Sequence, residues 1–352
     1  MLERISLDRE KEYLEKCAKE HKIPGGEFAI VTENESKCFC FGKKALLPNE
    51  VDNNIDTMYD LASLTKVVST TTMVLQCIEE GYFSLQTDIR NLIDVPYKGV
   101  TIENLLTHTS GLCADDKNYR KCSNKQEMID FVLNKELSYP TNSKVEYSDF
   151  GFILLGIILE KYVGDLDKYA HDNVFDPLEM KDTCYNPKSC RKDDRCAPTE
   201  LTSDRDLICG EVHDGKGLRL NGVSGNAGLF STVDDLTHFV QMLLLNGSWK
   251  GRRILHSSTV ELLKHCHTEG LNDRRTLGWF TNDRTTSMGD YYSEHCLYHT
   301  GFTGTSIYVD FDRKCGIILL TNRVHPTRDN NYIFDIRSIV HNMALLDFDD
   351  AK

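Results

Sequence analysis

The sequence lacks a long uninterrupted apolar run. Its most apolar stretch, residues 152–163, is too short to cross a bilayer and contains Glu160 and Lys161. Residues 1–21 carry acidic side chains where an export signal needs a basic flank and an apolar centre, and they indicate an amphipathic surface helix instead. From these two absences we expect a cytoplasmic protein without a membrane span.

Basic residues are also fewer than acidic ones. The chain has 41 Lys and Arg against 54 Asp and Glu, for a net charge of -13, and no basic stripe interrupts this balance. A polyanion would be repelled by such a surface, so we expect no nucleic-acid partner. Low-complexity tracts are missing as well, and hydrophobic residues make up 40% of the chain, which predicts a protein folded throughout.

Several common motifs are missing. The 13 cysteines include no C-x-x-C pair and their number is odd, which favours reduced thiols over a disulfide framework. Without a G-x-S-x-G elbow, a P-loop or a convincing G-x-G-x-x-G, the sequence excludes α/β-hydrolases, nucleotide triphosphatases and dinucleotide-binding enzymes. Neither "HCHTEG" at 265–270 nor the triplet Cys184, Cys190 and Cys196 has the spacing of a zinc knuckle, so we expect no metal site.

The hydrophobic periodicity changes along the chain. Alternating or β-branched runs predict a hairpin at 28–31 and 38–41, and a meander at 294–300, 305–311 and 315–321. Helical periodicity predicts helices at 63–81, 102–107, 125–134, 150–162, 233–245, 257–265 and 332–346. If the hairpin joins the meander, the two termini form one antiparallel sheet. We therefore predict an α+β fold, with a sheet domain of residues 1–60 and 275–352, a mainly helical domain of residues 61–274, and a site in the cleft between them.

Ser63 and Lys66 lie three positions apart at the start of a predicted helix, in the stretch "SLTK". Serine at a helix start is commonly a cap, and S-x-x-K alone is weak evidence for catalysis. The same position also suits a nucleophile, because unpaired backbone N–H groups at a helix start favour an oxyanion. A lysine one turn away can accept the serine proton if its surroundings do not keep it permanently protonated. Both interpretations are open at this point.

Two distant stretches favour the catalytic interpretation. "EYSDFGFILLGIILE" places Tyr147 just before a helix, and "LYHTGFTGTSIYVD" places His299 at the end of a strand. Taken singly, the first is an ordinary interfacial phenol and the second an exposed strand residue. Together, a serine with its lysine, a tyrosine and a cationic strand residue are the parts of a Ser-Lys-Tyr acyl-transfer site.

These motifs resemble those of the serine β-lactamase and penicillin-binding-protein-like superfamily. The branch they resemble is the class C β-lactamase-related one, which includes D-alanyl-D-alanine carboxypeptidases, D-aminopeptidases and esterases. The resemblance covers nearly the whole chain and rests on "SLTK", "TIENLLTHTSGL", "YSDFGFILLGIILE", "SGNAGLFSTVDDLTHF" and "HTGFTGTS". It implies an antiparallel sheet with flanking terminal helices, an all-helical insertion, and chemistry that needs no cofactor.

The resemblance also implies a role for each matching residue. Ser63 would be the acylated nucleophile, Lys66 its hydrogen-bonded partner, and Tyr147 the phenol that relays or accepts the proton and later helps to activate water. The backbone N–H groups of Ser63 and Phe302 would form an oxyanion hole, each donor contributing roughly 3 kcal/mol. His108, within "LLTHTSGL", is expected to be a structural hydrogen-bonding residue.

Two positions depart from the pattern of the family. Asp149 replaces the usual amide of Y-x-N, and its carboxylate would favour a charged Lys66 and so favour Tyr147 as the base. His299 replaces a lysine, and with a pKa of about 6.5 it would be only partly charged at neutral pH and would hold a substrate carboxylate weakly. The expected substrate-binding residues are Asp149, His299, Thr300, Gly301 and Arg323. For Arg323, and for His325 two residues later, a solvated loop is the favoured alternative.

The sequence thus predicts a serine hydrolase that cleaves an ester or amide through an acyl-enzyme on Ser63. The substrate would be a small molecule or short peptide, with β-lactams among the candidates. The missing export signal disfavours a cell-wall peptidase or a secreted resistance enzyme, whereas the motifs favour such activities. The alternative is a catalytically silent penicillin-binding or scaffold protein of the same fold, and the presence of Ser63, Lys66 and Tyr147 together argues against it.

Overall fold

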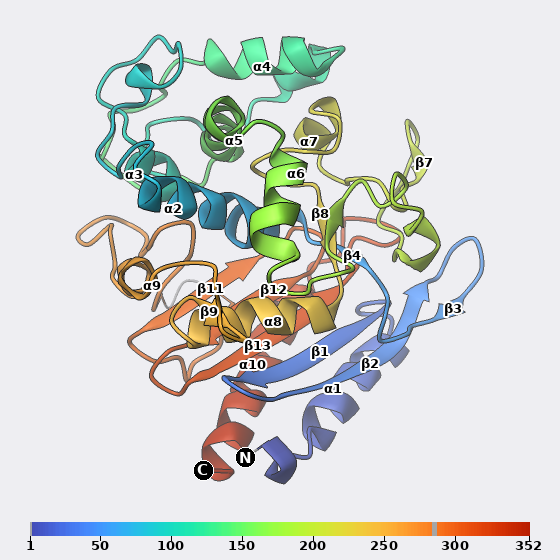
Figure 1. The fold of residues 1–352 in the computed structure, drawn as a ribbon. Helices are drawn as coiled ribbons and strands as arrows, with labels where there is room; N and C mark the ends of the chain where they lie inside the picture. Colours follow the sequence, from blue (N-terminus) through green and yellow to red (C-terminus); the bar gives the residue numbers. More distant parts are fainter. Residues whose placement is uncertain (1, 284–286) are drawn as a thin grey trace.

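The computed structural model describes residues 2–283 and 287–352, which form a sheet with terminal helices beneath a helical lobe (Figure 1). The main sheet is antiparallel with strand order β11-β12-β13-β1-β2-β3. Its strands are β1 (Gly25–Thr32), β2 (Ser36–Ala45), β3 (Val51–Asp52), β11 (Cys296–Thr300), β12 (Ser306–Asp310) and β13 (Cys315–Thr321). The predicted pairing of the hairpin with the meander is confirmed, because β1 pairs with β13 from Gly26 to Thr32.

The sheet is covered on both faces because its central strands alternate between two cores. Phe28 and Ile30 of β1 point toward one core, which they share with the terminal helices α1 (Asp8–Lys19) and α10 (Ile333–Asp350). Ala29 and Val31 point the other way, toward α8 (Val233–Leu244). Helices α1 and α10 contact each other, so the two ends of the chain lie side by side, as Figure 1 shows.

The helical lobe surrounds α5 (Asp149–Val163), which is apolar on all sides and buried along most of its length. Helices α2, α3, α4 and α6 contact it. The helices of this part are α2 (Thr72–Glu79), α3 (Ile102–Leu106), α4 (Lys125–Leu133), α6 (Leu166–Ala170), α7 (Gly215–Arg219) and α9 (Ser257–Leu263). A three-stranded sheet and two strand pairs complete it. The sheet has the order β4 (Tyr59–Asp60), β8 (Leu229–Ser231), β5 (Cys184–Tyr185), and the pairs are β6 (Leu201–Thr202) with β7 (Asp206–Leu207) and β9 (Ser248–Trp249) with β10 (Arg252–Arg253).

The boundary predicted between the two domains does not separate two cores. Helix α8 lies inside the predicted 61–274 helical domain, yet it packs on β1, β12 and β13. One hydrophobic cluster joins Val31 and Ile318 of the sheet to Phe150 and Leu155 of α5. The helical part is therefore an insertion that shares its interior with the sheet.

The helix predicted at 63–81 begins irregularly. A 3₁₀ turn (Ala62–Leu64) contains Ser63, a π-helical turn (Lys66–Thr71) follows, and only then does α2 begin. Ala62, directly before Ser63, has a left-handed φ of 46°, which costs energy in a residue other than glycine. Strain of this kind is common where a side chain must be held in an unusual position.

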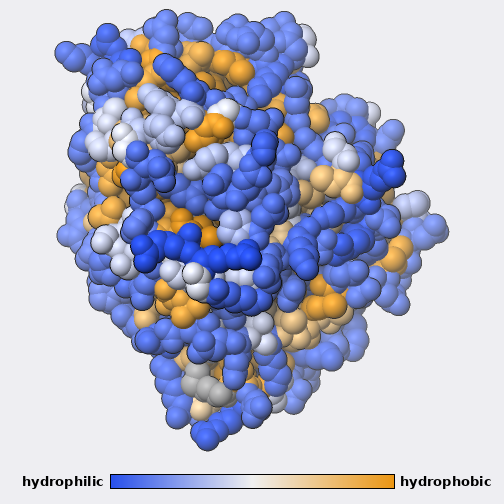
Figure 2. Space-filling model, viewed as in Figure 1, coloured by the Kyte–Doolittle hydropathy of each residue, from blue (hydrophilic) through white to orange (hydrophobic). Residues whose placement is uncertain are grey.

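None of the described helices is long and apolar enough to span a membrane. The longest of them, α10, has 18 residues and carries Asp335, Arg337 and three aspartates near its end. Figure 2 shows a face of the molecule on which hydrophilic residues predominate and apolar ones form separate patches.

Candidate active site

Lys66 is completely buried beside the hydroxyl of Ser63. Its Nζ donates hydrogen bonds to Ser63 Oγ at 3.0 Å and to the backbone oxygen of Asn226 at 3.0 Å. It also forms an ion pair with Asp149 Oδ1 at 2.8 Å. A solvated surface charge would have none of these contacts, so Lys66 is not a solvated surface residue.

The ion pair keeps both partners charged. Burial alone would lower the pKa of Lys66, but the Asp149 carboxylate and the Tyr147 phenol raise it above its ordinary value. Burial would conversely raise the pKa of Asp149, but Lys66 and a second lysine, Lys216, lower it to about 2. At neutral pH the site therefore holds an ammonium and a carboxylate, which agrees with the effect predicted for Asp149.

Tyr147 packs between Lys66 and His108. Its ring centroid lies 4.9 Å from Lys66 Nζ and 4.5 Å from the centroid of the His108 ring. The backbone N–H of Ser148 donates to His108 Nδ1 at 3.1 Å, and burial holds the pKa of His108 well below its usual range. His108 is thus a neutral, structural side chain, as predicted, and it fixes the segment that presents Tyr147.

The turn between β11 and β12 is docked against the chain just before the nucleophile. Thr303 Oγ1 donates to the backbone oxygen of Asp60 at 2.6 Å, and Thr305 Oγ1 donates to that of Leu61 at 3.1 Å. Gly301 permits this close approach, since a Cβ there would lie 2.4 Å from the Leu61 oxygen. These contacts hold the turn that contains Phe302 against the segment that directly precedes Ser63.

Asp60 fixes the strained residue before Ser63. Its Oδ1 accepts the backbone N–H of Ala62 at 2.8 Å, and its Oδ2 accepts that of His213 at 2.7 Å. Both oxygens are therefore used by backbone donors inside the protein. These bonds hold Ala62 in its left-handed conformation and so orient Ser63.

His299 does not fit its predicted charge state. Its side chain is 1% exposed, and Nδ1 donates to the backbone oxygen of Thr300 at 3.0 Å. Burial, Lys66 and Arg275 hold the pKa of His299 well below 6.5. The expectation of a partly charged histidine is therefore wrong, because burial penalises the charged imidazole and two nearby cations, Lys66 and Arg275, oppose its charge further.

Arg323 and His325 are buried, so the solvated-loop alternative is wrong for both. Arg323 donates through Nε to the backbone oxygen of Phe302 at 2.8 Å and through Nη1 to that of Asn330 at 2.6 Å. His325 Nε2 accepts the backbone N–H of Leu46 at 2.9 Å. In this structure both side chains hold backbone, and Arg323 supports the turn that carries Phe302.

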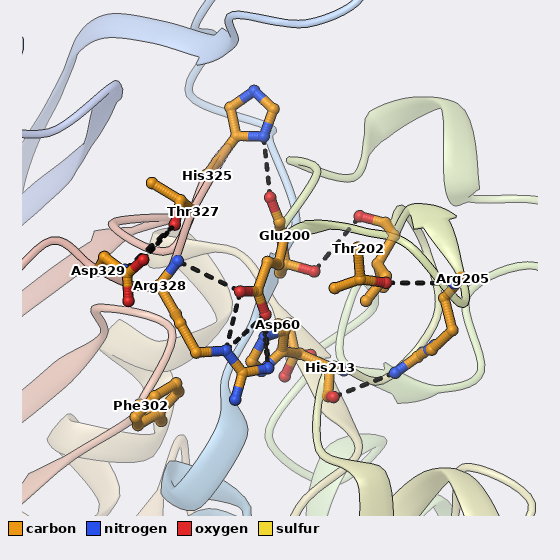
Figure 3. Close-up of polar contacts among 12 residues, drawn as sticks. Asp60, Glu200, Thr202, Arg205, His213, Phe302, His325, Thr327, Arg328 and Asp329 are labelled. Atoms are coloured by element: carbon orange, nitrogen blue, oxygen red, sulfur yellow. Dashed lines mark hydrogen bonds and ion pairs between the residues drawn. The ribbon is translucent and has the colours of Figure 1, made fainter.

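A second ion-pair cluster, formed by Glu200, His213 and Arg328, lies next to Phe302 (Figure 3). Arg328 Nε lies 2.8 Å from both carboxylate oxygens of Glu200, and His213 Nε2 lies 2.9 Å from Glu200 Oε2. The His213 ring stacks on Phe302 with 5.7 Å between centroids. Despite burial, Arg328 and His213 lower the pKa of Glu200 to about 2, so this carboxylate stays charged. The sequence did not predict this cluster, whose members come from three separate loops.

Lys216 was also missed by the sequence analysis. Its Nζ lies 3.0 Å from Asp149 Oδ2, whereas Lys66 contacts the other oxygen, Oδ1. The surrounding "HDGKGLR" contains two glycines and no apolar periodicity, so the short helix α7 was not predicted. The one usable signal was Asp214, a typical N-cap residue, which caps α7.

A cavity of about 460 Å³ lies to one side of the ion pairs. It is lined by Cys113, Asp115, Asp116, Phe131, Asn134, Lys135, Glu136 and Ser138. Asp115 lies 3.3 Å from Lys216, so the cavity adjoins the Lys216 side of the site. In the part of the chain that the structure describes, no group of three or more His, Cys, Asp or Glu is arranged to hold a metal ion.

The chain is similar to known proteins over almost its full length. The family model described as Beta-lactamase matches residues 11–340. An N-acetylmuramyl-L-alanine amidase of Bacillus subtilis is 30% identical, over 86% of this chain and 78% of its own. A putative D-alanyl-D-alanine carboxypeptidase of Escherichia coli K12 is 30% identical, over 87% and 80%.

The fold is shared with solved structures of low sequence identity. EstCE1, described as a hydrolase with promiscuous acyltransferase activity, superposes with a TM-score of 0.76 at 18% identity, over 97% of this chain and 100% of its own. The antiparallel sheet, the helical insertion and the Ser63–Lys66 contact agree with the family that the motifs resembled. The chain belongs to the β-lactamase family and is a serine hydrolase of that family.

Proposed function

We propose that this protein hydrolyses an amide or ester through an acyl-enzyme on Ser63. The observation that carries the proposal is the 3.0 Å hydrogen bond between Ser63 Oγ and a fully buried Lys66. Ser63 Oγ attacks the substrate carbonyl, its proton passes to the Lys66–Tyr147 pair, and the pair protonates the leaving amine or alcohol. Water then attacks the acyl group by the reverse proton route and restores the hydroxyl.

Within this pair we assign proton acceptance to Tyr147. Asp149 keeps Lys66 protonated, so Lys66 serves best as a donor that orients Ser63 Oγ and stabilises a phenolate on its neighbour. Because the two groups are in contact, protonation belongs to the pair rather than to either residue. The negative charge on the attacked carbonyl oxygen would be met by the N–H groups of Ser63 and Phe302.

An amide of a short peptide is the first substrate class to test. The amidase and carboxypeptidase names of the two relatives at 30% identity support it. An ester is the second, because a neutral His299 offers no cation for a substrate carboxylate. β-Lactams remain candidates as acylating agents, since they combine an amide carbonyl with ring strain.

The test uses covalent labelling and turnover together. The purified chain is incubated with a fluorophosphonate, a penicillin, p-nitrophenyl esters and D-alanyl amides, and intact mass and product are recorded. We expect an adduct and turnover that Ser63→Ala abolishes. The matched control is Ser257→Ala, a serine exposed at the start of α9, which should behave as wild type. Wild-type protein with neither adduct nor turnover would refute the proposal and favour the scaffold alternative.

A further inference from the structure

The Asp149 carboxylate lies between two ammonium groups. Oδ1 is 2.8 Å from Lys66 Nζ, and Oδ2 is 3.0 Å from Lys216 Nζ. The two lysine side chains are 0% and 7% exposed, so solvent screens neither contact strongly. Lys66 and Lys216 therefore share the Asp149 carboxylate.

Lys216 is fixed by a ring of contacts that returns to Lys66. Asp214 Oδ1 caps α7 by accepting the backbone N–H of Lys216 at 3.1 Å, and it also accepts Nδ2 of Asn226 at 3.1 Å. The backbone oxygen of Asn226 accepts from Lys66 Nζ at 3.0 Å. One closed circuit of contacts thus runs through Lys66, Asp149, Lys216, Asp214 and Asn226. A change of charge at Lys216 therefore acts on Lys66 through Asp149.

The remaining charged and titratable groups around the circuit come from several elements. Those facing Lys66 besides Asp149 are Tyr147, His108 and His299, and Arg275 lies behind them. Those facing Lys216 besides Asp149 are Asp115 at 3.3 Å and Asp214 at 3.8 Å, with the Tyr119 ring centroid at 4.9 Å. Of these, Asp149 alone has an ion pair with both lysines.

We propose that Lys216 is a positioning residue whose charge compensates Asp149 and thereby sets the pH at which the Lys66–Tyr147 pair can take the proton of Ser63. This inference rests on the proposed function. Without Lys216, the full charge of Asp149 would act on Lys66 and stabilise the protonated pair. Without Asp149, Lys216 would favour the deprotonated pair.

Four variants separate the charges. Lys216→Met should move the ascending limb of the pH–rate profile for fluorophosphonate labelling of Ser63 upward by about one pH unit or more, which lowers the rate about tenfold on that limb. Asp149→Asn should move the limb downward. The double variant Lys216→Met/Asp149→Asn should return it close to wild type, and Lys216→Arg should leave it in place.

A structural role would not produce that pattern. The control is Lys125→Met, which removes a 2.9 Å ion pair to Glu160 on the same helix α5 and should leave the limb unchanged. If Lys216→Met lowers the labelling rate equally at every pH, or if the double variant shifts as far as the single one, the proposal is wrong. Lys216→Arg and the double variant retain a balanced charge, so they test the proposal even if Lys216→Met does not fold.

A second measurement is independent of reactivity. In protein labelled with ¹³C-lysine, the Lys66 resonance, assigned with Lys66→Arg, is titrated in wild type and in the four variants. We expect its titration to move to higher pH in Lys216→Met and to lower pH in Asp149→Asn; identical titrations would overturn the inference. Wild-type protein that is never labelled at Ser63 would instead refute the proposed function, while the titration still decides the role of Lys216.

Discussion

A buried lysine lowers the stability of the folded state unless a group of opposite charge lies beside it. Moving an ammonium out of water costs several kcal/mol, which an ion pair of good geometry and further hydrogen bonds can offset. Lys66 has one ion pair, with Asp149, and two further hydrogen bonds, with Ser63 and Asn226 as acceptors. The groups that offset the free-energy cost of burying Lys66 are thus the same groups that direct its ammonium toward Ser63.

Replacing Tyr147 separates the role of its hydroxyl from that of its ring. Tyr147→Phe keeps the ring packed against His108 but removes the proposed proton acceptor. We expect kcat/KM to fall by roughly 10²- to 10⁴-fold, with little change in Tm. Steady-state kinetics and thermal unfolding measure the two effects. A variant with wild-type kcat/KM would show that Tyr147 does not accept the proton.

The neutral state of His299 predicts a flat pH dependence. With its pKa held well below 6.5, His299 carries no charge between about pH 6 and 8, and nothing at this position titrates there. The Michaelis constant of a carboxylate-bearing peptide should therefore not respond to His299 in this range. The measurement compares wild type with His299→Asn from pH 6 to 8. A Michaelis constant that rises with pH in wild type but not in the variant would show that His299 is charged at the lower pH, against this prediction.

Residues inside local motifs were predictable, and those defined by distant partners were not. Ser63, Lys66 and Tyr147 stand in short stretches whose spacing carries their chemistry. The burial of His299 depends on what packs around it, and the part played by Lys216 depends on its contact with α5. Both are tertiary effects that no pattern within one segment contains.

Among the elements, the turn between β11 and β12 is held by side chains and backbone from several parts of the chain. It is hydrogen-bonded to Asp60 and Leu61 and supported from behind by Arg323. Arg337 Nη2 also donates to the backbone oxygens of Gly301 and Thr305, at 3.0 and 2.8 Å. Periodicity predicted the strands on either side, but the docking of the turn depends on side chains from elsewhere in the chain.

A methyl group at Gly301 should disturb this turn. The added Cβ of Gly301→Ala would meet the Leu61 oxygen at 2.4 Å and Thr305 Oγ1 at 2.1 Å, so the backbone must move away from Ser63. We expect kcat to fall at least tenfold and Tm to decrease. The matched control is Gly151→Ala in α5, where the nearest contact would be an ordinary 3.6 Å and alanine favours the helix. Equal kinetics in both variants would contradict the docked turn.

For the molecule as a whole, the hydrophobic core that the sheet shares with α5 predicts cooperative unfolding. Residues of the sheet and of α5 belong to one hydrophobic cluster, although the sequence suggested two domains. Both tryptophans, Trp249 and Trp279, are buried in it. In urea we expect their fluorescence and the far-UV circular dichroism to follow one transition. Two separated transitions would show that the helical insertion unfolds alone.

Buried histidines should make the whole molecule less stable in mild acid. Burial lowers the pKa of His341, whose Nδ1 donates to the backbone oxygen of Met288, to about 3, and His108 and His299 are lowered in the same way. Well above pH 6.5, the ordinary pKa of histidine, these groups are neutral in both states. Below it the unfolded chain takes up protons that the folded one does not, so the free energy of unfolding falls as pH falls.

His341→Gln tests this contribution, because glutamine can still donate to Met288 but does not titrate. Between pH 6.5 and 5, the free energy of unfolding should fall less steeply in this variant than in wild type, by up to about 1.4 kcal/mol per pH unit. Urea unfolding at several pH values measures the slope. The control is His265→Gln, whose side chain is 62% exposed and which should keep the wild-type slope. An unchanged slope in His341→Gln would mean that His341 is protonated in the folded protein as readily as in the unfolded one.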